Sequence, residues 1–231
     1  MTTSTRSKND NRSAHRHSRS PSARNHPAPK WWSQQALVPI GGIAGMLSPL
    51  PLLAAGWITA TAGQNLRQNG FPWVATLAAI LTAMCVLGLG ALLSGHGSVV
   101  VRMAGLATAV ALVGIAVFFA ALGTEDLLAT VVGTSRFLSD NEAITSIGTL
   151  TGSLLTLVVA PLGLLILGVA AFRSRLLSRT GRLAAVALTP CLVVGALTSA
   201  AATSAPTAAA WVLMFSACWF VLGRALLQSS R

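Results

Sequence analysis

The chain has 231 residues, of which 53% are hydrophobic and only 9% are charged, and its formal net charge is +11. Soluble domains contain about 25% charged residues, so this composition excludes an ordinary soluble domain. The apolar residues form long consecutive runs, and each run is long enough to cross about 30 Å of hydrocarbon as a helix. The sequence therefore predicts an all-α integral membrane protein, since a membrane barrel would need short alternating strands.

Residues 1–30 are mostly Ser, Arg, Asn, His and Pro. Such a segment has too few apolar side chains to offset the entropy of ordering, so we expect a disordered N-terminal tail. The tail is strongly basic, with Asp10 as its single acid. An anionic lipid surface attracts such a segment, so the positive charge indicates lipid headgroups and the bilayer as partners rather than nucleic acid.

Residues 31–231 are expected to form one transmembrane domain of six helices. The spans are predicted at about residues 36–60, 72–93, 99–122, 146–172, 183–202 and 208–222. Trp31 and Trp32 precede the first span, where aromatic residues anchor helices at the membrane interface. The fifth span is the weakest of the six, because its many Ala, Ser and Thr residues contribute little insertion energy.

The first span contains Pro49 and Pro51, which lack backbone donors. We therefore expect a break in this helix around Ser48 to Pro51. Between the third and fourth spans, residues 123–145 are predicted to form the one sizeable loop, which carries four of the five acids of the chain. The middle of this loop, residues 127–138, has the pattern of a short interfacial helix.

The Lys and Arg residues lie almost entirely on one side of the predicted spans. Only Arg67 and Arg136, of 16 basic residues, lie on the side opposite the tail. Because cytoplasmic loops collect Lys and Arg, both termini are predicted to be cytoplasmic, which requires an even number of spans. The composition, rich in Ala and in Arg over Lys, is typical of a bacterial protein, here of the cell membrane.

Few polar residues in the spans indicate chemistry. Arg102 lies about one turn inside the third span, and His96 lies in the preceding turn. Arg102 is expected to reach back to the headgroup layer, either simply to stay hydrated or to bind an anionic headgroup together with His96. Cys85, Cys191 and Cys218 are isolated and are expected to be small buried apolar residues.

Four hydroxyl residues recur at helical spacing in the fourth span: Ser146, Thr149, Ser153 and Thr156. This spacing places them on one face of a helix. Such a face is either a packing seam between helices or the polar lining of a solute path. Gly41 with Gly45 and Gly148 with Gly152 share a spacing that also fits an inverted repeat of a transporter.

The sequence predicts no catalytic, cofactor-binding or metal-binding residues. No Asp, Glu, Lys or His lies deep in a predicted span, where proton-coupled or ion-coupled sites generally need one. We therefore expect a non-enzymatic accessory or scaffold subunit that binds a membrane-protein partner or a second copy of the chain. The alternative is a small permease for an apolar or zwitterionic solute, built on the broken first span and the hydroxyl face.

Overall fold

The computed structural model describes residues 34–62, 70–94, 99–133, 146, 150–152, 154–200 and 205–230. The predicted tail at residues 1–30 lies outside these ranges. Within them, every regular element is a helix. The elements are α1 (Gln34–Leu47), α2 (Pro49–Ala62), α3 (Phe71–Ser94), α4 (Val99–Val132), the π-helical turn η2 (Leu155–Val159), α7 (Ala160–Ser174), α8 (Arg179–Ala200) and α9 (Ala205–Ser229).

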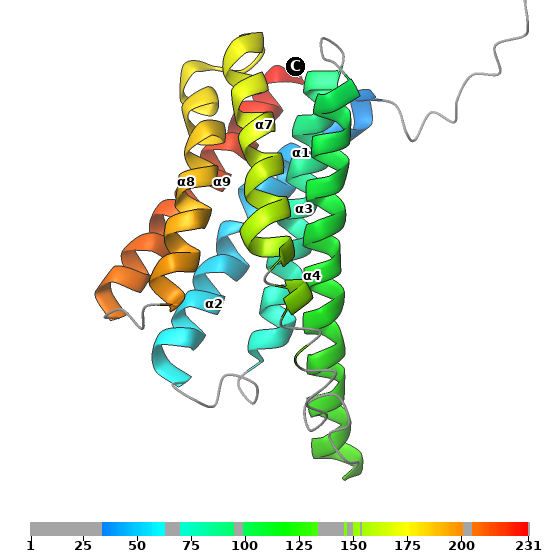
Figure 1. The fold of residues 1–231 in the computed structure, drawn as a ribbon, viewed down its shortest axis with the longest axis vertical. Helices are drawn as coiled ribbons and strands as arrows, with labels where there is room; N and C mark the ends of the chain where they lie inside the picture. The colour runs from blue at the N-terminus through cyan, green and yellow to red at the C-terminus, as the bar shows by residue number, and fades with distance from the viewer. Residues whose placement is uncertain are drawn as a thin grey trace, which may run out of the picture.

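The helices form a closed ring in which each one packs against its neighbours along the chain (Figure 1). The α1–α2 unit packs on α3, α3 on α4, α4 on α7, α7 on α8, and α8 on α9. The ring closes because α9 packs back on α1 and α2. As a result, the start of α1 and the end of α9 lie at the same end of the bundle (Figure 1). Short connections between neighbours favour this up-and-down order.

Five helical segments of the described chain are long and apolar enough to cross a membrane, so the prediction of a membrane protein holds but the count of six does not. The five segments are Ala36–Thr59, Phe71–Ser94, Val99–Val132, Leu150–Ser174 and Ala209–Ser229. The predicted fifth span is present as α8, a helix of 22 residues. Helix α8 is not among the five segments, although its only charged residues, Arg179 and Arg182, lie in its first turns.

The first crossing consists of two helices that meet at Ser48, where the sequence places a break. Pro49 has no N–H to donate to the Gly45 carbonyl, so this carbonyl loses its regular helical partner. The Ser48 hydroxyl, which is fully buried, donates to the same carbonyl oxygen at 3.0 Å. Backbone bonds from Ser48 N to Ala44 O and from Leu52 N to Ser48 O hold the two helices in line. The break is therefore a local interruption inside one span.

Helix α4 continues ten residues beyond the predicted end of the third span, so residues 123–132 are helical and are not a loop as expected. Gly123 does not end the helix, because it is a packing position: a methyl group there would lie 2.9 Å from Cε2 of Trp73 in α3. The hydroxyls of Thr124 and Thr130 donate to the Ala120 and Asp126 carbonyls one turn earlier. These bonds keep the polar residues inside the helix. The predicted interfacial helix at 127–138 is thus, as far as residue 132, the end of α4.

Glycines allow neighbouring helices of the ring to touch through their backbones. A methyl group on Gly45 of α1 would lie 2.9 Å from the Gly223 Cα of α9, and one on Gly168 of α7 would lie 2.9 Å from the Ala185 carbonyl oxygen of α8. Gly163 of α7 lies against the Thr108 side chain of α4. Such approaches replace side-chain contacts by close backbone packing, which stabilises helix pairs in lipid.

The start of the fourth crossing departs from α-helical geometry. Pro161 has no N–H for the Leu157 carbonyl, and the preceding turn is the π-helical η2, in which the Ala160 N–H bonds to the Leu155 carbonyl. At the other end of α7, Arg175 adopts a left-handed conformation with φ of 54° and begins the turn to α8. Ser178 then caps α8, because its hydroxyl accepts the Gly181 N–H at 3.3 Å.

Candidate functional site

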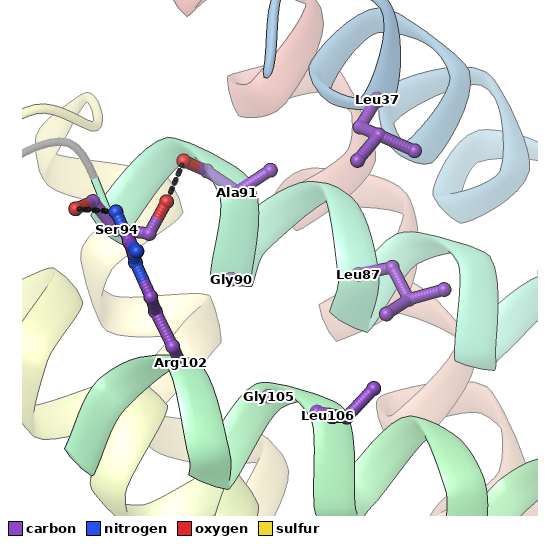
Figure 2. Close-up of a pocket in the computed structure, with 8 residues that line it drawn as sticks. All are labelled: Leu37, Leu87, Gly90, Ala91, Ser94, Arg102, Gly105 and Leu106. Carbon is purple, nitrogen blue, oxygen red and sulfur yellow. Dashed lines mark hydrogen bonds between the residues drawn. The ribbon is translucent and has the colours of Figure 1, made fainter. Parts of the chain in front are cut away.

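A hollow of about 270 Å³ lies between α1, α3 and α4, at the end of the bundle where α3 turns into α4. Its apolar wall consists of Leu37, Leu87 and Leu106, one from each helix (Figure 2). Its polar side is formed by Arg102 and Ser94, also seen in Figure 2. The hollow therefore has two halves of different chemistry, one apolar and one that carries a cation.

Small residues of α3 and α4 create the space for this hollow. Gly90 and Gly105 face one another across the two helices, and a methyl group on Gly105 would lie 3.4 Å from the Gly90 Cα. Ala91 completes the wall on α3. With side chains this small, the two helix backbones approach and leave a shallow recess between the larger residues on either side.

The Arg102 side chain reaches along α4 toward the end of α3, away from the apolar half of the hollow (Figure 2). Its Nη2 donates to the Ser94 carbonyl oxygen at 3.5 Å, which is a long and weak hydrogen bond. The Ser94 hydroxyl donates to the Ala91 carbonyl at 2.9 Å. Arg102 is exposed, and this bond uses one of its five guanidinium N–H donors. A guanidinium presents its donors in a planar fork that matches the oxygens of a phosphate.

The structure describes only one of the two residues of the predicted headgroup contact. Arg102 lies in the first turn of α4, while His96 lies outside the described residues. Sequence reasoning missed the Ser94 carbonyl and the leucines of α1 and α3, because they come together only when the three helices pack.

The predicted hydroxyl face of the fourth span is mostly outside the described part of the chain. Ser146 is described and exposed, whereas Thr149, Ser153 and the Thr156 side chain are not described. Gly152 has open space around it, with no atom within 4 Å of a methyl group placed there. The alternatives of a packing seam and a solute path therefore both stay predictions.

A second surface of interest is a stripe of exposed apolar residues along α4. We name it the α4 stripe; its eight residues are Val99, Met103, Leu106, Val110, Val113, Val117, Leu127 and Val131. Ala120 and Thr124 continue the same spacing between Val117 and Leu127, so the stripe repeats in steps of four and three residues over the whole helix. This is the heptad spacing that lets a second helix pack along the first.

The α4 stripe lies on a helix that is longer than one membrane crossing needs. Helix α4 has 34 residues, which at 1.5 Å per residue is about 51 Å, whereas the hydrocarbon core is about 30 Å thick. The far end of α4 projects beyond the other helices (Figure 1). There Leu127, Leu128, Val131 and Val132 are between 47% and 72% exposed. Lipid tails cover apolar side chains inside the membrane, but those on a projecting helix end need another cover.

Charge is segregated between the two ends of the bundle. Within the described residues, all six arginines lie toward the end that holds the hollow: Arg102, Arg173, Arg175, Arg179, Arg182 and Arg224. The two described acids, Glu125 and Asp126, lie on the projecting end of α4. Arg182 also lies over the Phe172 ring, with Cζ 5.8 Å from the ring centroid. The basic end is the one that the sequence assigns to the cytoplasm.

No protein-family model matches this chain, and comparison with curated proteins and with solved structures finds no match either.

Proposed function

We propose that this protein is a non-enzymatic accessory or assembly subunit of a bacterial cell membrane, and that it holds a membrane-protein partner through the α4 stripe. The observation that carries this proposal is the apolar end of α4, where Leu127, Leu128, Val131 and Val132 are exposed beyond the length that lipid covers. A helix of a partner, packed along the heptad spacing of the stripe, covers both the part in lipid and the part outside.

The proposal includes α8 as a sixth crossing, with the basic end in the cytoplasm. Three features support this sixth crossing. The 22 residues of α8 span about 33 Å, α8 packs against both α7 and α9, and the start of α1 and the end of α9 lie at one end of the bundle (Figure 1). Since cytoplasmic loops collect arginine, the six described arginines support a cytoplasmic location for that end.

The hollow beside Arg102 suits an anionic phospholipid. Its guanidinium fork would hold a phosphate, and the leucine wall of the same hollow would contact an acyl chain. Bound anionic lipid at this position would fix α3 and α4 relative to the cytoplasmic headgroups. It would act as a structural partner of the bundle and not as a substrate.

A photo-crosslinking residue at Val131 tests the α4 stripe in native membranes. Trp57, on α2, is the matched control, because it also lies toward that end of the bundle and both side chains are 72% exposed. The proposal predicts a discrete adduct from Val131 and none from Trp57. An adduct with a different membrane protein identifies a partner, whereas an adduct of twice the chain mass identifies a homo-oligomer. Equal yields at both positions, or no adduct along the stripe, would contradict it.

The small permease stays as the second candidate, because the first crossing is interrupted at Ser48, near its middle. Broken helices at mid-membrane form the solute sites of many transporters. Alanine at Thr149, Ser153 and Thr156 separates the two functions. Loss of solute flux by a folded triple variant would favour the permease, and loss of assembly would favour the accessory subunit.

A further inference from the structure

The interruption between α1 and α2 lies level with the middle of α9. Two close contacts fix this register: Gly45 approaches the Gly223 Cα, and Gly56 approaches the Val212 side chain. Eleven residues separate the two contacts on each helix, so the antiparallel register is constant between them. Leu52, seven residues after Gly45, therefore lies level with Ser216, seven before Gly223.

Two polar side chains of α9 are buried at this level without a hydrogen-bond partner among the described residues. The Ser216 side chain is 3% exposed and that of Trp219 is 1% exposed. Neither the Ser216 Oγ nor the Trp219 Nε1 has a partner there. The other described indole of α9 does have one, because Trp211 donates to the Cys191 carbonyl. A buried donor without an acceptor is costly, and native structures rarely leave one.

The Ser216 side chain faces the interrupted crossing. It lies four residues after Val212, which contacts Gly56 of α2, and seven before Gly223, which contacts Gly45 of α1. Residues at these spacings share one helical face. Trp219 follows Ser216 by one turn and lies level with Pro49. Its ring packs edge-on against Phe215, with centroids 5.9 Å apart.

The helices opposite α9 supply hydroxyl oxygens at the same depth. Ser48 is 0% exposed and Thr82 of α3 is 4% exposed. The contact of Gly41 with Gly88 places these two residues at about one level in the antiparallel helices, because Ser48 lies seven residues after Gly41 and Thr82 lies six residues before Gly88. Both hydroxyls already donate to carbonyls of their own helices, so each oxygen still has lone pairs to accept a bond.

We propose that one ordered water molecule is bound at this level, the mid-membrane site, where it accepts the Trp219 N–H and shares a hydrogen bond with the Ser216 hydroxyl. A water molecule both donates and accepts hydrogen bonds. It therefore satisfies the two α9 groups and can donate a hydrogen bond to an acceptor oxygen nearby. Internal waters typically bind where two to four polar groups converge in an otherwise apolar surrounding. The polar side chains buried near this level in an otherwise apolar surrounding are Ser216, Trp219, Ser48 and Thr82.

X-ray radiolytic labelling of the purified full-length protein in lipid nanodiscs tests the mid-membrane site. A side chain next to a bound water is oxidised by radicals formed from that water, even when bulk solvent does not reach it. The probe is Trp219 in the wild type and in the Ser216→Ala variant, which leaves the indole unchanged. We expect oxidation of Trp219 in the wild type and its loss in the variant. A Trp219 that stays unoxidised in both proteins, or is oxidised equally in both, overturns the proposal.

The melting temperature gives a second, independent measure. If the site is dry, Ser216→Ala removes an unpartnered hydroxyl and adds a better helix former, so the melting temperature stays level or rises. If the water is bound, the same change lowers it by about 2–4 °C. Thr189→Val is the control, because the Thr189 Oγ1 is also buried without a partner among the described residues and lies on α8, whose main contacts are with α7 and α9. A lower melting temperature for Thr189→Val alone would overturn the assignment to this site.

Discussion

Gly41 of α1 and Gly88 of α3 touch through their backbones. A methyl group on Gly41 would lie 2.7 Å from the Gly88 Cα, and one on Gly88 would lie 2.8 Å from the Gly41 Cα. The nearest other atoms are also backbone, the Met84 carbonyl in one case and the Leu37 carbonyl in the other. Since no side-chain end can move aside, the separation of the two helices is set by the absence of a Cβ at both positions.

Substitution of Gly88 by Ala is expected to destabilise the bundle. The new methyl group forces α1 and α3 apart, and overpacking of this kind costs about 1–3 kcal/mol. The measurement is the free energy of unfolding in mixed detergent micelles, followed by circular dichroism. Gly114→Ala in α4 is the control, because its nearest contact is Leu155 Cδ1 at 3.5 Å. The control should be neutral or slightly stabilising, since Ala favours helix over Gly; equal loss in both variants would contradict the close-contact account.

The Ser48 hydroxyl should matter only while Pro49 is present. In the wild type, Ser48→Ala leaves the Gly45 carbonyl without its 3.0 Å partner and should cost about 0.5–1.5 kcal/mol of unfolding free energy. In a Pro49→Ala background the backbone N–H of residue 49 restores the helical bond, so the same change should cost much less. A double-mutant cycle measures the difference. Additive effects of the two substitutions would show that Ser48 does not cap this carbonyl.

If α8 crosses the membrane as proposed, the residues before α8 and those at the start of α9 lie on opposite sides of the membrane. Ser178 precedes α8, Thr207 lies near the start of α9, and both are exposed. Single cysteines at these positions, in a background without Cys85, Cys191 and Cys218, should react with an impermeant thiol reagent from opposite sides of sealed vesicles. Ser178→Cys should react from the cytoplasmic side. Reaction of both from one side would mean that α8 does not cross.

Arg102→Leu is expected to reduce the amount of anionic phospholipid that copurifies with the protein. The substitution replaces the guanidinium by a shorter, apolar side chain at an exposed position, so insertion and folding should be unchanged. Native mass spectrometry of protein reconstituted with phosphatidylglycerol measures the bound lipid. Arg175→Leu is the control, because Arg175 is exposed at the same end but lies on the turn after α7. Equal lipid binding by the wild type and Arg102→Leu would contradict the proposed lipid site.

The sequence predicted the helical membrane fold because long apolar runs have one physical solution in lipid. It predicted the break at Ser48 for a local reason, since Pro49 removes a donor wherever it stands. It wrongly predicted a loop from residue 123, because Gly123 is typical of a helix end and only its contact with Trp73 shows that it is a packing position.

Features that depend on several helices were not predictable from one chain position at a time. The hollow beside Arg102 needs leucines from α1, α3 and α4 together. The orphaned groups of Ser216 and Trp219 emerge only once the register of α9 against α1 and α2 is known. The glycines themselves are visible in the sequence, but spacing alone does not say that Gly41 packs against α3 while Gly42, the next residue, packs against α9.

The proposed role is tested most directly by purifying the tagged protein from its native host in mild detergent and measuring the stoichiometry of the proteins that come with it. The wild type is compared with a Leu127→Asp, Val131→Asp double variant, in which both substituted side chains are exposed on the projecting end of α4. We predict a stoichiometric membrane-protein partner with the wild type and its loss from a variant of equal helicity and yield. Recovery of the wild type alone as a monomer would contradict the accessory role.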